Sequence, residues 1–111
     1  ASTITVQFVW TAASGTGGVV WACQGLATSD DDALDQAYGT EQIIADTLIA
    51  ANDDHHTAFT PAITIAGTPV AGDLVNLRFK RNPADASDTL AADARLIAVR
   101  VRFTMTQYDD Q

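Results

Sequence analysis

The first 77 residues contain no lysine or arginine, although they hold nine of the fourteen acidic residues of the chain. All six basic residues lie between Arg78 and Arg102, and the net charge is −8. Nucleic-acid binding needs Lys and Arg to displace counterions from phosphates, so this charge balance argues against a nucleic-acid partner. Thirteen of the acids are Asp and one is Glu, which favours turns over helix interiors.

Two further absences narrow the class of protein. Cys23 is the single cysteine, which excludes an internal disulfide framework, and its apolar surroundings predict a buried, inert thiol. No apolar run approaches the ~20 residues that span a bilayer, so no membrane partner is expected. At 111 residues the chain suits one domain and is too short for two, and we predict a single domain over residues 1–111.

Alternation of apolar and polar residues predicts strands along much of the chain. One face of the stretch STITVQFVWTA is apolar, as in a half-buried strand: Ile4, Val6, Phe8 and Trp10. The pattern also favours strands within 19–27, 40–50, 63–66, 74–81 and 95–105, although 40–50 fits a helical stripe as well. The glycine-rich stretch ASGTGG is typical of a turn, and we expect it to join the first two strands as a hairpin.

The last two strands have well-defined faces. In 74–81, the residues expected to point inward are Val75, Leu77 and Phe79. The segment 95–105 has the strongest alternation in the chain, and we expect one face of it to be core: Ile97, Val99, Val101, Phe103 and Met105.

The order of these elements predicts an all-β fold. Six or seven short strands without a long helix favour an antiparallel two-sheet β-sandwich with jelly-roll-like or immunoglobulin-like wiring. Two long acidic loops, 28–40 and 83–94, join the strands. In the first of them, Ser29 is placed to cap a short helical turn that Gly39 would end.

The two acidic loops are the candidate metal site. If they lay at one end of the sandwich, their carboxylates could converge on calcium, which prefers hard oxygen ligands. The candidate ligands are Asp30, Asp32, Asp35, Asp85 and Asp88. Neither loop matches the known calcium-loop pattern, and solvated caps and turns explain the same acids. A small hydrolase would instead use Asp35 or Asp88 in a closed pocket.

No enzymatic motif is found elsewhere in the chain. His55 and His56 are adjacent, so on an extended segment they point to opposite faces, and surface histidines are expected rather than a zinc site. The stretch AASGT lacks the turn that a serine nucleophile needs. The sequence therefore predicts a protein that is not an enzyme and has no cofactor.

Six short motifs form a specific pattern when they are taken in chain order. They are VVW at 19–21, DALD at 32–35, YGT at 38–40, GD at 72–73, RN at 81–82 and DTLAADARL at 88–96. With their flanking residues they cover about three quarters of the chain, and the pattern resembles a family of small virion proteins of tailed bacteriophages.

The resemblance implies a structural role in the virion, assembled in the cytoplasm of the bacterial host. The expected protein is a β-sandwich module of a capsid decoration, fibre or tail appendage, and its partners are copies of itself in a homotrimer and other virion proteins. Four outward-facing bases could pair with acidic loops of a neighbour: Arg78, Lys80, Arg100 and Arg102. The alternative is an adhesion module in which Tyr38 stacks on a host surface glycan and the acidic loops bind its hydroxyls.

The chain departs from that family at its beginning. Relatives have further strand sequence before the segment equivalent to residues 3–11, where this chain almost starts. We therefore expect one sheet to be incomplete by itself. Either a neighbouring subunit supplies the missing strand, or the chain is the C-terminal part of a longer polypeptide. An unpaired edge strand is a ready docking surface.

Overall fold

The fold is all-β, as predicted. The computed structural model describes residues 3–33, 35–67, 70 and 72–104, and within them it contains seven strands and no helix. The strands are β1 (Thr3–Thr11), β2 (Gly18–Thr28), β3 (Gln42–Thr47), β4 (His55–His56), β5 (Ile65–Ala66), β6 (Leu74–Arg81) and β7 (Arg95–Thr104). No helix that could cross a membrane is present in these ranges.

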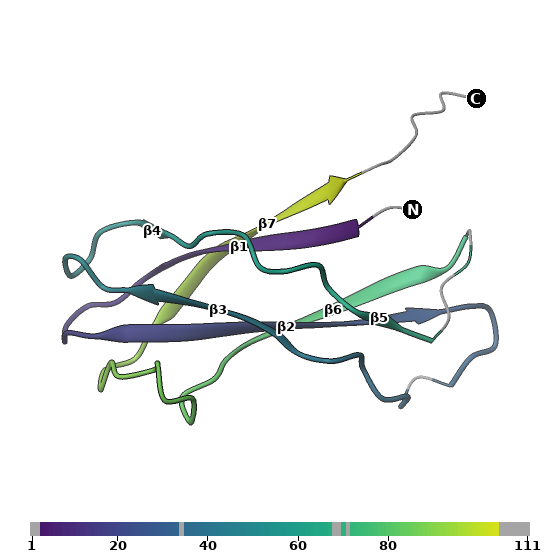
Figure 1. The fold of residues 1–111 in the computed structure, drawn as a ribbon, viewed down its shortest axis with the longest axis horizontal. Coiled ribbons are helices and arrows are strands. Elements are labelled where there is room, and N and C mark those ends of the chain that lie inside the picture. The colour runs from purple at the N-terminus through teal and green to yellow at the C-terminus, as the bar shows by residue number, and fades with distance from the viewer. Residues whose placement is uncertain (1–2, 34, 68–69, 71, 105–111) are drawn as a thin grey trace.

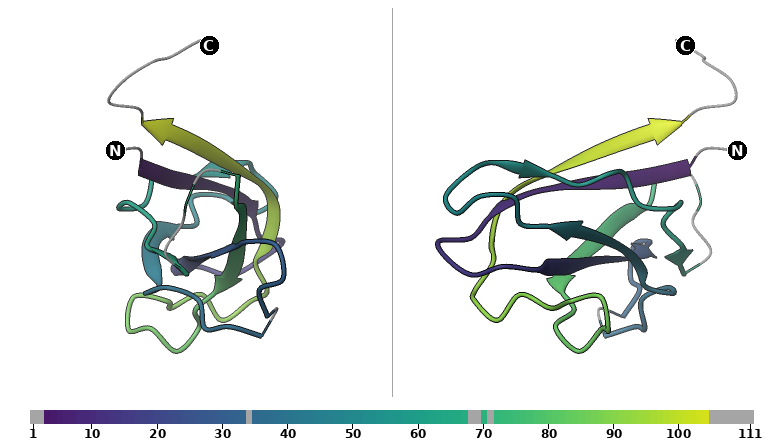
Figure 2. Two further views of the ribbon diagram at one scale, coloured as in Figure 1. Left: turned by 90° about the vertical axis from the view of Figure 1, so that its right-hand side faces the viewer. Right: turned by 60° about the vertical axis from the view of Figure 1, so that its left-hand side comes forward.

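The strands form two sheets, which Figures 1 and 2 show as two layers. The first sheet has the order β4-β1-β7. In the second, β3 and β6 both pair with residues 21–23 of β2, so they lie on its opposite edges. The short strand β5 pairs in parallel with β2 on the edge that β3 occupies, and every other pairing is antiparallel.

The predicted hairpin between the first two strands is wrong. β1 and β2 belong to different sheets, so the glycine-rich turn carries the chain from one layer to the other. Gly15 and Gly17 have φ values of 97° and 115°, and a Cβ on Gly17 would lie 2.6 Å from Thr89 Oγ1. The turn residues were read correctly, but alternation cannot tell whether two successive strands pair or face each other.

The core lies between β1 and β2. It includes the apolar face predicted for β1 together with alternate residues of β2, among them Val19, Trp21 and Cys23. Phe8 stacks on Trp21 with ring centroids 5.6 Å apart, and Phe79 of β6 meets Phe8 edge-on at 5.9 Å. Burial raises the pKa of Cys23 to about 11, which fits the predicted inert thiol.

The segment 55–63 covers the edge of β1 opposite β7. Its backbone N–H groups at Thr57, Thr60 and Ile63 donate to the carbonyl oxygens of Phe8, Val6 and Ile4, at 3.0, 2.9 and 2.8 Å. The donors are every third residue of the segment 55–63, whereas the acceptors are every second residue of β1. This mismatch interrupts the regular hydrogen-bond ladder of a β-sheet. Threonine hydroxyls replace the missing carbonyls, because Thr57 Oγ1 accepts from Phe8 N–H at 3.1 Å and Thr60 Oγ1 from Val6 N–H at 3.2 Å.

We call this side of the molecule the closed side, and it consists of β3, the turn 48–54 and the segment 55–63. Two links join the two sheets here. At one end, Trp10 Nε1 donates to Asp46 Oδ2 at 3.0 Å, which joins β1 to β3. At the other end, the chain passes from Ile63, bonded to β1, to β5, bonded to β2.

His55 belongs to this closed side and is buried, contrary to the expected surface histidine. Its Nε2 accepts from the Ile49 N–H at 2.9 Å, its Nδ1 lies 2.8 Å from the Asp53 carbonyl oxygen, and its ring packs on Trp10. His56 is exposed beside Asp54, as expected. The two rings point apart, so no zinc ligand pair forms.

Candidate assembly surface

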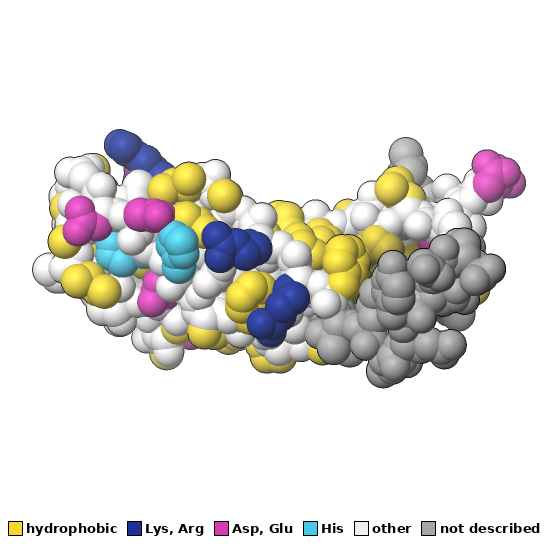
Figure 3. Space-filling model, turned by 90° about the horizontal axis from the view of Figure 1, so that it is seen from above, with side chains coloured by type: hydrophobic (Ala, Val, Ile, Leu, Met, Phe, Trp, Pro, Cys, Tyr) yellow, Lys and Arg dark blue, Asp and Glu magenta, His cyan; other side chains and the backbone are white. Residues whose placement is uncertain are grey.

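The side between β6 and β7 leaves inward-facing apolar residues uncovered. On β7, Val99 is half-buried, Val101 is 39% exposed and Phe103 is 66% exposed. On β6, Leu77 is half-buried and Val75 is 40% exposed. We call these five residues and the edges of their strands the open side. Figure 3 shows a row of hydrophobic side chains on the face seen from above, beside exposed Lys and Arg side chains.

The open side exists because one connection alone spans it. Loop 82–94 joins β6 to β7 at the end where Arg81 and Arg95 lie. Among the five residues of the open side, exposure increases away from this loop along both strands, and Figure 1 shows the strands separating in that direction. Within the described residues, β7 pairs with β1 alone and β6 with β2 alone, so both strands have a free edge.

The expectation that the apolar face of the last strand is core is therefore wrong for most of it. Val101 and Phe103 lie opposite Val6 and Ile4, on the predicted inward face, but the described part of the chain leaves them 39% and 66% exposed. The register shifts by one residue beside Trp10, which leaves Ile97 without a Cα partner and 57% exposed. Met105 lies outside the described residues.

The charge asymmetry of the sequence maps onto the open side. Every lysine and arginine of the chain lies on one of its two strands: Arg78, Lys80 and Arg81 on β6, and Arg95, Arg100 and Arg102 on β7. Two of them have carboxylate partners, since Lys80 Nζ lies 2.9 Å from Glu41 Oε1 and Arg81 pairs with Asp88. This clustering was the signal in the sequence that could have marked the two strands as a surface.

Three of the four predicted assembly bases have neutral partners within the described residues. Arg100 Nη1 donates to Gln7 Oε1 at 2.8 Å, and the Arg102 guanidinium lies 4.0 Å from the centre of the Phe59 ring. Arg78 donates to the side-chain oxygen of Gln24 at 2.7 and 3.0 Å. The fourth base, Lys80, is the one already paired with an acid.

Tyr38, the candidate sugar-stacking residue, is only half-buried, but one face of its ring is occupied. The Arg78 guanidinium lies over it, 4.4 Å from the ring centre. A cation on an aromatic face is a stabilising contact within the chain. A sugar could therefore stack on the other face alone.

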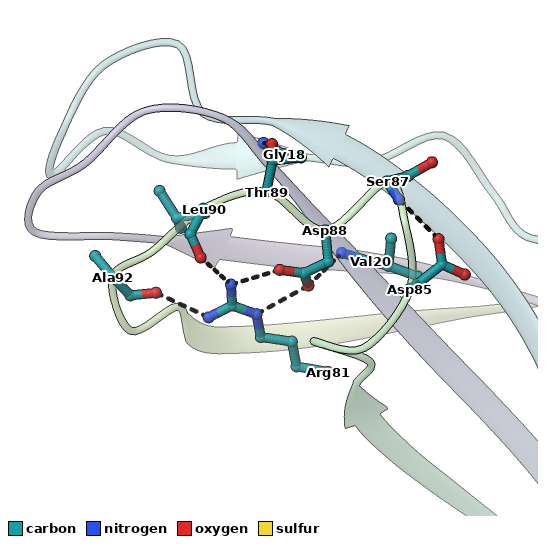
Figure 4. A network of polar contacts seen from close by, with 9 residues as sticks. All are labelled: Gly18, Val20, Arg81, Asp85, Ser87, Asp88, Thr89, Leu90 and Ala92. Carbon is teal, nitrogen blue, oxygen red and sulfur yellow. Dashed lines mark hydrogen bonds and ion pairs between the residues drawn. The ribbon is translucent and has the colours of Figure 1, made fainter.

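The loop 82–94 is held by a buried ion pair, shown in Figure 4. Arg81 Nε and Nη2 donate to the two carboxylate oxygens of Asp88 at 3.0 and 2.7 Å, and the guanidinium also donates to the carbonyls of Leu90 and Ala92. Asp88 Oδ2 accepts from the Val20 N–H at 3.0 Å, which ties the loop to β2. The Asp88 side chain is 2% exposed and that of Arg81 is 20% exposed.

These contacts make Asp88 a structural carboxylate. The hydrogen bonds from Arg81 lower its pKa, and the Val20 N–H acts in the same direction against the effect of burial. A general acid needs a raised pKa, and both oxygens here are already engaged. The geometry therefore gives no support to a hydrolase that uses Asp88.

The aspartates of the two acidic loops do not meet, although Asn82 Nδ2 of one loop donates to Glu41 Oε2 of the other at 3.1 Å. β6 runs antiparallel to β2, with Leu74 beside Thr28 and Arg81 beside Trp21, so loop 29–41 leaves one end of β2 while loop 82–94 lies near the other. Figure 1 shows them at opposite ends of the molecule. The condition for a shared calcium site, with Asp30, Asp32 and Asp35 facing Asp85 and Asp88, is not met. No cluster of three metal-binding side chains occurs in the described ranges.

The expected helical turn at 29–39 is also wrong. Ser29 instead begins a tight turn, in which the Asp32 N–H donates to the Ser29 carbonyl at 3.1 Å and Asp32 Oδ2 accepts from the Ser29 N–H at 2.8 Å. The Ser29 hydroxyl donates to Asp73 Oδ1, and this bond lowers the pKa of Asp73. Asp31 takes a φ of 72°, which ends any helical path at this point.

Comparisons with protein-family models, with curated proteins and with solved structures found no match to this chain. The surface itself must therefore carry the functional argument. It offers two free strand edges, a row of uncovered apolar side chains and several exposed cations. In general, free strand edges and exposed apolar patches are features of protein–protein interaction sites.

Proposed function

We propose that this protein is a non-enzymatic structural component of a tailed-bacteriophage particle, which assembles by burying its open side. The observation that carries the proposal is the incompletely covered inward face of β7, where Val101 and Phe103 are 39% and 66% exposed beside an unpaired strand edge. The sequence motifs that resemble small virion proteins supply the phage context.

Burial of this surface would favour assembly. Covering a Val or Phe side chain fully is worth about 1.5–3 kcal/mol, and an edge strand adds backbone hydrogen bonds that have no partner in the free subunit. The partners that we propose are further copies of this chain, in a homotrimer, and other virion proteins. The place in the particle would be a capsid decoration, a fibre or a tail appendage.

Jelly-roll-like wiring is part of the same proposal. It is supported by the two sheets and by a chain that crosses between them after β1, β3, β4 and β6. Such modules pack side by side in particles by matching their strand edges and loops.

Solution mass by light scattering tests the proposal. We expect a defined homotrimer for the unaltered chain, and a folded monomer after Arg100→Glu and Arg102→Glu, because these side chains lie on the outer face of the assembling strand. The matched control, Arg100→Lys with Arg102→Lys, keeps both charges and should retain the trimer. A wild-type chain that stays monomeric at every concentration would contradict self-assembly, and an unchanged oligomer in the Glu variant would exclude these arginines.

A further inference from the structure

We propose that copies of this chain associate head to tail, with the open side of one copy against the closed side of the next. The inference rests on the proposed function, since it names the two surfaces that meet when the chain assembles. It follows from how charge and exposed apolar residues are divided between the two sides of the sandwich.

The two sides differ in the charged residues that they supply. All six bases belong to β6 and β7, although the Arg102 side chain reaches Phe59 of the closed side; the closed side itself, which falls within residues 42–63, supplies no Lys or Arg. The closed side carries acids instead. Asp53 and Asp54 are exposed in the turn 48–54, and Asp46 is half-buried on β3. Complementary fields of this kind select the partner surface and the orientation of docking.

The closed side also has its own exposed apolar residues. Ile49 is 88% exposed and Ile43 is 42% exposed, and both lie on or just after β3. β3 pairs with β2 alone among the described residues, so it presents a free edge as well. The closed side thus offers an apolar contact, an acidic rim and a strand edge that complement the open side of another copy.

A two-fold arrangement is disfavoured by the same charges. An axis that pairs β7 with its own copy keeps the strand faces aligned, so Arg100 and Arg102 of one copy would lie beside the same residues of the other. Pairing β7 with a neighbour's β6 would set them beside Arg78 and Lys80. Like charges directly opposite each other across strands are destabilising. Head-to-tail contacts avoid this, and they close into a ring such as a trimer when the rotation permits.

A mixing experiment with two half-broken variants tests the arrangement. The open-side variant carries Val75→Ser and Phe103→Ser, and the closed-side variant carries Ile49→Ser and Asp53→Asn. The altered side chains are exposed, so both variants should fold, which circular dichroism and thermal unfolding would verify. Light scattering then gives the mass of the wild type, of each variant alone and of an equimolar mixture.

We expect a wild-type ring and two monomeric variants, each with self-association weakened by at least about 100-fold, because a ring needs both sides intact. The mixture should form a 1:1 dimer, because each variant retains the side that the other has lost. A closed-side variant that assembles like wild type, or a mixture that stays monomeric, would overturn the inference while leaving self-assembly intact. A monomeric wild type would instead overturn the proposed function, and the inference with it.

Discussion

The closed side and the open side of the sandwich differ in how their strand edges are covered. On the closed side, the edge of β1 is covered by a segment whose threonine hydroxyls complete the hydrogen bonds that an irregular path leaves open. On the open side, the edges of β6 and β7 stay free and apolar residues face solvent. Side chains of the same chain can thus satisfy the backbone hydrogen bonds of a strand edge. Where no such side chains are present, we expect a neighbouring molecule to cover the edge.

The largest loss of stability should come from disrupting the Arg81–Asp88 ion pair, which holds loop 82–94 across the open side. Asp88→Ala would leave the Arg81 charge and the Val20 N–H without their partner in a mostly buried place, so we expect a loss of about 3 kcal/mol in the free energy of unfolding. Denaturant titration measures it. Asp88→Asn keeps an acceptor but not the charge and should cost less, and equal, small losses in both variants would contradict the role of the ion pair.

Acid should remove part of the same stabilisation. The pKa of Asp88 is lowered in the folded protein, so its contribution is fully present above the unfolded value of about 3.9 and is lost as pH falls through the folded value. Unfolding free energies measured between neutral pH and pH 2 should therefore fall less steeply in Asp88→Asn than in wild type. Parallel curves would show that other carboxylates dominate the acid response.

Removing a threonine hydroxyl that covers the edge of β1 on the closed side should destabilise the fold less than Asp88→Ala does. Thr60→Val keeps the shape of the side chain but removes the acceptor of the buried Val6 N–H, which should destabilise the fold by about 1–2 kcal/mol. Thr60→Ser retains the hydroxyl and serves as the control. If the two variants are equally stable in denaturant, the hydroxyl does not complete the edge as the geometry indicates.

The smallest effect on folding is expected at the open side. Phe103 is mostly exposed, so Phe103→Ser should change the stability of the monomer by less than about 1 kcal/mol, although it lies on the predicted core face. Thermal unfolding at a concentration low enough to keep the chain monomeric would measure this. A loss of several kcal/mol would mean that Phe103 is covered in the free subunit and that the open side is closed.

Some features of the candidate sites could be predicted from local sequence, and others depended on contacts between distant segments. Glycine positions, strand faces and an inert Cys23 could be read locally, because each depends on neighbouring residues. The calcium hypothesis failed at a non-local step. Whether Asp32 and Asp88 meet depends on which end of β2 each loop leaves, and this follows from the pairing of β6 with β2. The hydrogen bonds that employ Asp88 and Ser29 also join residues far apart in the chain.

By itself, the sequence determined that the chain is all-β, which face of β1, β6 and β7 is apolar and that all positive charge follows residue 77. These properties are local, because side chains alternate along any strand whatever it pairs with. Only the tertiary structure decided that β1 and β2 face each other, that the aspartates of the two acidic loops lie near opposite ends of β2 and that Val101 and Phe103 are incompletely covered. Pairing and coverage depend on contacts between distant segments, which a periodic pattern does not encode.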